Sequence, residues 1–263
     1  MVFEKVVILC GGLGTRLKEE TEFKPKPMVE IGGRPILWHI MKMYSSFGFN
    51  DFVLCLGYKG NVIRDYFYNY RAQNTDFTVN LRNNDEIVFH NDACVEDWKV
   101  TLVNTGEKNL KGSRIKQIEK HIGGNPFLLT YGDGVAKINI HKLLDFHVNH
   151  GLVGTMTGVS PPSRFGVVDS NRGVVTSFFE KPQAAGGVIN GGFFVFENEF
   201  FDYLSPDPTC EFESGALGRL VDEANLALYP LKSDWACMDT LRDVEYLNEL
   251  WRQDKAFWKM WRD

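Results

Sequence analysis

A glycine-rich segment near the N-terminus carries residues that could bind phosphate. Gly11, Gly12 and Gly14 follow the short apolar run Val6–Leu9, which predicts a buried strand. A strand that leads into such a turn brings bare backbone N–H groups to the carboxyl edge of a sheet, where phosphates bind. Arg16 adds a forked, permanently charged donor. The segment matches neither the dinucleotide fingerprint nor the Walker pattern, so it predicts a phosphate site of another kind.

A lysine between two prolines follows ten residues later. Pro25 and Pro27 flank Lys26, and we expect them to hold the backbone extended, so that the lysine stands on a stiff loop and not on a helix. Alone, this Lys-Pro-Lys-Pro segment would as readily be an ordinary surface loop. Together with the glycine segment it favours a site for a polyphosphate.

Two aspartates are candidate metal ligands. Asp133 lies between two glycines directly after the apolar run Phe127–Tyr131, at the end of a predicted strand. Mg²⁺ in proteins takes one or two carboxylates and completes its shell with water and phosphate oxygens. Asp239 offers a second carboxylate just before the C-terminal helical segment. The alternatives are a tight turn capped by Asp133 and a helix N-cap at Asp239.

Candidates for binding a polyhydroxy ligand lie in the second half of the chain. Lys181 follows the predicted strand Val174–Phe179, and Asn190 and Gly191 precede the predicted strand Phe193–Phe196. The glycine allows a close approach of the backbone, and the amide supplies both donors and an acceptor. Surface lysines and glycine turns are also common without any ligand.

The histidines do not indicate catalysis or a zinc site. His141, His147 and His150 lie on or near a helix predicted at 139–149, without neighbouring ligands at zinc spacing. We interpret them as solvated helix surface. No serine, histidine and aspartate combination suggests nucleophilic catalysis.

Composition limits the class of protein. The 263 residues are 44% apolar and 24% charged, with a net charge of −5, which argues against a nucleic-acid partner. The five cysteines form no C-x-x-C pair, which predicts reduced thiols in a cytoplasmic protein. No signal peptide is evident, and no apolar run reaches the ~18 residues of a membrane span. We therefore expect a soluble protein with a small anionic substrate.

The order of predicted elements indicates an α/β fold. Strands at 6–9, 52–56, 127–131 and 154–159 alternate with helices at 36–47, 62–70 and 139–149. This alternation predicts right-handed βαβ units and a mostly parallel, twisted sheet flanked by helices. Residues 72–99 predict a β-hairpin arm that turns at Asn83–Asp85, and the chain becomes helical after residue 240.

With these residues in view, the chain resembles the sugar-1-phosphate nucleotidyltransferases, and most closely the glucose-1-phosphate cytidylyltransferases. The resemblance covers nearly the whole length. Its motifs are Gly11–Arg16, Lys24–Gly33, Pro35–Met41, Gly57–Gly60, Val103–Gly106, Tyr131–Val135, Glu180–Pro182, Asn190–Phe194 and Met238–Asp243.

The resemblance implies a Rossmann-like fold and a Mg²⁺-dependent reaction of CTP with α-D-glucose 1-phosphate that gives CDP-glucose and pyrophosphate. It implies Arg16 and Lys26 as catalytic residues, Asp133 and Asp239 as metal ligands, and Lys181, Asn190 and Gly191 as sugar-phosphate ligands. The implied nucleotide site consists of Leu9, Gly11, Gly12, Leu13, Gly14, Thr15, Arg16, Lys26, Thr105, Arg114 and Gly132.

It also implies one domain over 1–263 that forms a homo-oligomer, a hexamer or a tetramer. Residues 1–135, with the arm at 72–99, would bind the nucleotide, residues 136–240 the sugar phosphate, and 241–263 would form a helical segment. The arm and the C-terminal helices resemble family elements used in subunit contacts. No nucleic acid or membrane partner is implied.

Two departures from the family pattern leave alternatives open. Cys10 replaces the usual alanine, and Phe212–Leu217 lacks an acidic residue and a proline near the sugar side. The second departure leaves the hexose open, and base choice between CTP, dTTP and UTP depends on the resemblance. A catalytically silent protein that binds nucleotide sugars is the alternative from another class, although Lys26, Asp133, Lys181 and Asp239 are all retained.

Overall fold

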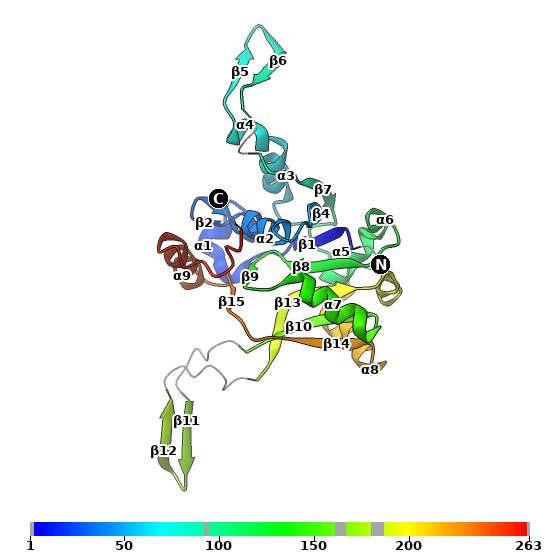
Figure 1. The fold of residues 1–263 in the computed structure, drawn as a ribbon, viewed down its shortest axis with the longest axis vertical. Coiled ribbons are helices and arrows are strands. Elements are labelled where there is room, and N and C mark those ends of the chain that lie inside the picture. The colour runs from blue at the N-terminus through cyan, green and yellow to red at the C-terminus, as the bar shows by residue number, and fades with distance from the viewer. Residues whose placement is uncertain (1–2, 92–94, 161–166, 180–186, 262–263) are drawn as a thin grey trace.

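The computed structural model contains a central seven-stranded sheet between two layers of helices (Figure 1). It describes residues 3–91, 95–160, 167–179 and 187–261. The strand order is β14-β10-β13-β8-β1-β4-β7, and only β13 runs antiparallel to its neighbours. The strands are β1 (Lys5–Cys10), β4 (Asp51–Leu56), β7 (Lys99–Asn104), β8 (Phe127–Tyr131), β10 (Gly154–Val159), β13 (Ile189–Phe196) and β14 (Leu226–Leu231). The predicted mostly parallel, Rossmann-like sheet is confirmed.

Two apolar cores lie on opposite faces of this sheet. Side chains alternate along a strand, so Val6 and Ile8 of β1 face one core while Val7 and Leu9 face the other. The first core is covered by α2 (Ile36–Ser45), α7 (Ile140–His150) and α9 (Leu241–Arg252). The second is covered by α5 (Lys111–Gln117), α6 (Glu119–Ile122), η3 (Asn198–Tyr203), η4 (Phe212–Leu217) and α8 (Gly218–Asp222). Burial on both faces explains why the central strands read as continuous apolar runs.

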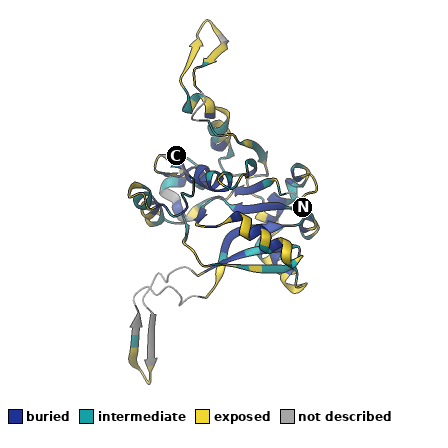
Figure 2. Cartoon of the chain, in the orientation of Figure 1, coloured by how far each residue is buried: buried dark blue, intermediate teal, exposed yellow. Residues whose placement is uncertain are grey.

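An arm projects from the body between β4 and β7. It consists of α3 (Gly60–Tyr68), α4 (Tyr70–Asn74), β5 (Phe77–Asn80) and β6 (Asn83–Phe89). Its hairpin is largely exposed, as Figure 2 shows. The predicted hairpin is confirmed, but the predicted turn position is wrong.

The turn lies at Leu81-Arg82, because Asn80 pairs with Asn83 and Phe77 with Phe89. The Asn80 side chain accepts a hydrogen bond from the backbone N–H of Arg82, 3.1 Å away. This local bond favours a turn at Asn80 over one at the following asparagines.

The helical C-terminus is shorter than expected. α9 ends at Arg252, where Asp254 adopts a left-handed conformation with φ of 54°. The N–H of Lys255 then bonds the carbonyl of Leu250 at 2.8 Å, which satisfies a helix-terminal acceptor. The following residues up to 261 are not helical, and within them Trp258 is buried in the first core.

The interpretation of the three histidines as solvated surface is wrong for His147. Its side chain is fully buried between α7, to which it belongs, and β10. Its Nδ1 lies 2.7 Å from the hydroxyl of Thr155, which also lies 2.7 Å from Nε2 of His150. Both histidines therefore fix the end of α7 against β10. Their spacing along the helix could not distinguish this packing from exposure to water.

Shorter elements complete the described chain. They are η1 (Thr15–Leu17), α1 (Lys18–Thr21), η2 (Lys26–Met28), β2 (Glu30–Ile31), β3 (Arg34–Pro35), β9 (Gly134–Ala136), β11 (Val167–Asn171), β12 (Val174–Phe179) and β15 (Trp235–Cys237). β11 and β12 form a separate two-stranded sheet. Among the described helices, none has the length and apolar character needed to cross a bilayer.

Candidate active site

The glycine segment forms a loop at the carboxyl end of β1. Gly12 is exposed, and a Cβ placed there would meet nothing within 4 Å, so its backbone is open to a ligand. Gly14 has a φ of 64°, which favours glycine. Leu13 and Thr15 are also exposed, while the side chain of Arg16 lies outside what the structure describes. The loop therefore has the bare, accessible backbone that a phosphate site requires.

Lys26 is presented differently from the prediction. Pro25 is extended as expected, but Lys26 begins a single 3₁₀ turn, closed by a 2.8 Å bond from the N–H of Met28 to the carbonyl of Pro25. A proline at the second position of such a turn loses no hydrogen bond and has a suitable φ. The prediction of an extended, non-helical loop is therefore wrong for Lys26 itself.

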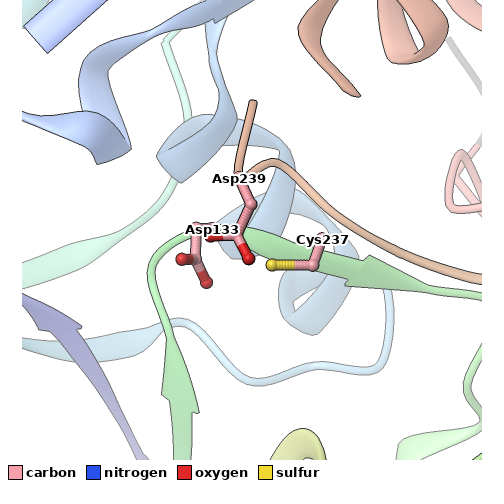
Figure 3. Close-up of side chains that lie close together, drawn as sticks. All are labelled: Asp133, Cys237 and Asp239. Carbon is pink, nitrogen blue, oxygen red and sulfur yellow. The ribbon is translucent and has the colours of Figure 1, made fainter. Parts of the chain in front are cut away.

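The two candidate metal ligands are brought together by a pair of short strands. Asp133 lies between β8 and β9, and Asp239 follows β15. β15 pairs antiparallel with β9, and the N–H of Met238 donates to the carbonyl of Asp133 at 2.8 Å. Figure 3 shows both carboxylates and the Cys237 side chain converging at this point. The side chain of Asp133 therefore belongs to a cluster of potential ligands.

Asp239 is not the N-cap of α9. Thr240 caps the helix, and the Asp243 carboxylate accepts from the backbone N–H groups of Asp239 and Thr240 at 3.0 and 2.8 Å. These bonds fix the backbone of Asp239 against the start of α9. The alternative role proposed from sequence is therefore wrong, and the Asp239 side chain is directed to the cluster.

The ammonium of Lys26 lies between the two carboxylates. Nζ is 2.6 Å from Oδ2 of Asp133 and 2.5 Å from Oδ1 of Asp239. All three side chains are mostly shielded from solvent. Burial alone would lower the pKa of Lys26, but the charge and hydrogen bond of Asp133 and the bond to Asp239 outweigh it and raise the pKa. The carboxylates thus already hold one cation, and their hard oxygen donors suit Mg²⁺.

Arg114 and Thr105 lie beneath the glycine loop. The guanidinium of Arg114 would collide with a Cβ at Gly11 or at Gly57, so both positions require glycine. It donates to the carbonyls of Leu56, Gly106 and Glu107, at 3.3, 2.6 and 3.1 Å, and to the hydroxyl of Thr105 at 3.2 Å. Burial lowers its pKa.

The Thr105 side chain is completely buried. Its hydroxyl donates to the carbonyl of Leu56 at 2.7 Å while accepting from Arg114. These bonds fix β4 and β7 under the loop. Arg114 and Thr105 therefore support the backbone beneath the glycine loop.

Gly132 links the end of β1 to the carboxylate cluster. Its N–H donates to the carbonyl of Leu9 at 3.2 Å, and a Cβ there would lie 2.9 Å from Pro27. The turn after Lys26 therefore packs directly on the end of β8. This contact holds Lys26 near Asp133 and explains the need for glycine before that aspartate.

Asn190 and Gly191 lie in a polar group at the start of β13. Nδ2 of Asn190 donates to the Tyr131 hydroxyl at 3.2 Å, and the Tyr131 hydroxyl donates to Glu213 at 2.9 Å. Lys111 forms an ion pair with Glu213 and lies over the Tyr131 ring, 5.0 Å from its centroid. The carbonyl of Gly191 accepts from the indole of Trp235 at 2.7 Å.

Sequence reasoning missed Tyr131, Lys111 and Cys237 as members of these clusters. Burial and the neighbouring Glu213 charge raise the pKa of Tyr131, so its hydroxyl stays a donor. Tyr131 lies two residues before Asp133, and its position at the end of a predicted strand was the available signal. Lys181 was proposed from sequence but lies outside the described residues.

Comparison with known proteins identifies the family of the chain. Residues 5–263 match the family described as "Nucleotidyl transferase". The chain is 49% identical to the "Glucose-1-phosphate cytidylyltransferase" of Salmonella typhimurium, over 98% of this chain and 99% of that protein. It is 41% identical to the "Probable glucose-1-phosphate cytidylyltransferase" of Bacillus subtilis, over 98% and 100% of the two chains.

Solved structures share the fold. The crystal structure of HddC from Yersinia pseudotuberculosis has 25% identity and a TM-score of 0.68, over 95% of this chain and 100% of that one. The UTP-bound UGPase from Acinetobacter baumannii is 15% identical, with a TM-score of 0.70 over 96% and 94% of the chains, which shows the fold alone. The family model spans nearly the whole chain, and the protein therefore belongs to the nucleotidyl transferase family.

Proposed function

We propose that the protein transfers a cytidylyl group from CTP to α-D-glucose 1-phosphate, giving CDP-glucose and pyrophosphate. The observation that carries the proposal is the convergence of Lys26, Asp133 and Asp239 beside an open glycine loop. The relatives named for this reaction match at 49% and 41% identity over nearly their full length, which supports this choice of base and sugar.

The reaction needs charge stabilisation and not a general base. An oxygen of the sugar phosphate attacks the α-phosphorus of CTP, the bond to the bridging α–β oxygen breaks, and pyrophosphate leaves with that electron pair. The attacking oxygen is already ionised at neutral pH, so no side chain has to remove a proton. The protein has to align two polyanions and neutralise developing charge. The proposed catalytic residues Arg16 and Lys26 are cations of the kind this requires.

We assign the nucleotide to the N-terminal part of the site. Backbone N–H groups from Gly11 to Thr15 would bind the triphosphate, and Leu9, Thr105, Arg114 and Gly132 would form or support the pocket. The Arg114 side chain packs against Gly11 and bonds the carbonyls of Leu56 and Gly106, so it supports the start of the loop from below. This is the role we give residues 1–135, with residues 136–240 binding the sugar phosphate.

Asp133 and Asp239 would hold Mg²⁺. Bound there, the metal would supply charge neutralisation at phosphate oxygens. The donor set fits a hard cation, since two carboxylates converge and an ammonium already lies between them. The same cation would compete with Lys26 for these carboxylates, which frees the ammonium for phosphate oxygens.

Asn190, Gly191 and Lys181 are proposed for the sugar phosphate. Asn190 belongs to a hydrogen-bonded group with Tyr131 and Glu213, whose donors and acceptors suit hydroxyl groups. Glu213 lies in the segment that departs from the family pattern, so this group is where a different hexose would be selected. We further propose a cytoplasmic homo-oligomer with contacts through the arm.

The testing experiment is pyrophosphate release with Mg²⁺ over a grid of nucleoside triphosphates and hexose 1-phosphates. We expect one strong response, at CTP with glucose 1-phosphate. A response with dTTP or UTP, or with another sugar, would reassign the base or the hexose while keeping the chemistry. No response anywhere in the grid, with CDP-glucose binding retained, would instead indicate a silent nucleotide-sugar-binding protein.

A further inference from the structure

Cys237 lies with the two candidate metal ligands. One ligand atom from each of Asp133, Cys237 and Asp239 lies within 4.8 Å of the other two. In Figure 3 the Cys237 sulfur points toward the carboxylates of both aspartates. The cluster thus contains a soft sulfur donor beside two hard oxygen donors.

The backbone holds these three residues in place. Cys237 lies opposite Gly134 in the β9–β15 pair, and the N–H of Met238 bonds the carbonyl of Asp133 at 2.8 Å. The three donors therefore come from two chain segments joined by main-chain hydrogen bonds. Such a framework can hold a metal ion without first ordering a loop.

The spacing suits a tetrahedral ion after a small movement of side chains. Zinc bonds of about 2.3 Å to sulfur and about 2.1 Å to oxygen place tetrahedral donors about 3.6 Å apart. Donors within 4.8 Å of one another have to approach by about 1 Å, which rotation about side-chain bonds supplies. Water or a substrate oxygen would complete the four positions.

The cluster already attracts a cation. The Lys26 ammonium lies 2.6 and 2.5 Å from the two carboxylates. A divalent cation at this position would neutralise the two carboxylates and make a thiolate ligand beside them favourable.

We propose that Cys237, Asp133 and Asp239 form a binding site for thiophilic divalent cations such as Zn²⁺, Co²⁺ and Cd²⁺. On binding, the sulfur–hydrogen bond of Cys237 is replaced by a sulfur–metal bond, and the proton passes to solvent. The Lys26 side chain moves away from the carboxylates and remains a protonated ammonium. Thiolate donors select these ions over Mg²⁺, which prefers oxygen. The inference deepens the proposed function, because the same carboxylates are the proposed Mg²⁺ ligands.

Cobalt reports sulfur ligation directly. Titrating the full-length protein with Co²⁺ is expected to produce a thiolate-to-cobalt charge-transfer band in the near ultraviolet. Cys237→Ser removes the sulfur donor and should abolish the band. Cys210→Ser is the matched control, since Cys210 is also partly exposed but forms no such cluster with the residues that the structure describes, and it should keep the band.

Zinc affinity and proton release give two further readouts. Competition with a chromophoric chelator should show the Zn²⁺ affinity at least about tenfold lower in Cys237→Ser than in Cys210→Ser. In weakly buffered solution near neutral pH, the wild-type protein should release about one proton per Zn²⁺ bound, from the thiol. This last measurement requires no variant to fold.

A charge-transfer band that persists in Cys237→Ser would overturn the proposal, as would Zn²⁺ binding without proton release. Failure of the proposed function is separate from these outcomes. A cobalt–sulfur band in a protein that is inactive with Mg²⁺ across the substrate grid would keep the metal site and reject the cytidylyl transfer. Full activity with Mg²⁺ and no band would do the reverse.

Discussion

We expect His39 to make the stability of the protein sensitive to mild acid. It is completely buried on α2, where Nε2 lies 2.8 Å from the carbonyl of Ile31 and Nδ1 accepts from the Trp258 indole at 3.3 Å. Only the neutral ring satisfies both partners, because a second proton would sit on Nδ1 and face the indole N–H. Burial, assisted by the charge of Arg34, lowers the pKa of His39 to about 4, although hydrogen bonds with the backbone of Ile31 and of Arg34 act to raise it.

The sign and size of the effect follow from this shift. The pKa falls from 6.5 in the unfolded chain to about 4 in the folded one, so the unfolded chain binds more protons between these values. The contribution of neutral His39 to the free energy of unfolding is complete above pH 6.5 and decreases as the pH falls from 6.5 to about 4. At pH 5, about 1.5 pH units below the pKa of 6.5 in the unfolded chain, about 2 kcal/mol of the free energy of unfolding is lost, at about 1.4 kcal/mol per pH unit.

Urea unfolding at pH 7 and pH 5 measures this loss in His39→Gln and wild type. Glutamine can donate to Ile31 and accept from Trp258 but does not titrate, so its loss between the two pH values should be about 2 kcal/mol smaller. His141→Gln, at an exposed histidine of α7, is the control and should behave as wild type. An equal loss in His39→Gln and wild type would refute the reasoning.

Three further predictions concern the site and the arm. Asp133→Asn should lower kcat by about 10²–10³-fold, since a neutral amide binds Mg²⁺ poorly; near-normal turnover at saturating Mg²⁺ would exclude the metal role. Glu213→Gln should raise KM for glucose 1-phosphate about tenfold and leave KM for CTP unchanged, because the Tyr131 hydroxyl loses its charged partner; equal changes in both would contradict the assignment. Replacing residues 76–90 by a short glycine-serine link should lower the mass seen by light scattering, and an unchanged mass would show that the arm is not an assembly element.

Local sequence was enough to predict the frame of the protein. Continuous apolar runs such as Val6–Leu9 indicated strands buried on both faces, and alternation with helices indicated a parallel sheet. The glycine loop and Lys26 were found for the same reason, since their residue types and spacing carry the chemistry. The turn at Leu81-Arg82 and the 3₁₀ turn at Lys26 were missed. The first depends on the bond from the Arg82 N–H to the Asn80 side chain and the second on the bond from the Met28 N–H to the Pro25 carbonyl, and residue types alone do not show which of several local bonds forms.

Contacts between distant segments decided the rest. The spacing of histidines on α7 could not show that His147 is buried, because the strand that covers it begins after the helix ends. Asp133 and Asp239 were each ambiguous in the sequence, as a turn residue and as a helix cap. The pairing of β9 with β15 brings them to one ammonium and adds Cys237 beside them.

The sequence by itself therefore determined where the main strands and the glycine loop lie along the chain and which charged side chains are candidates for a site. The tertiary structure decided which of those side chains share a site, because more than a hundred residues separate Lys26 from Asp133 and Asp133 from Asp239 along the chain. Residues so far apart leave no local periodicity to read. Their meeting depends on strand register and on the packing of Pro27 against Gly132, which are properties of the folded chain alone.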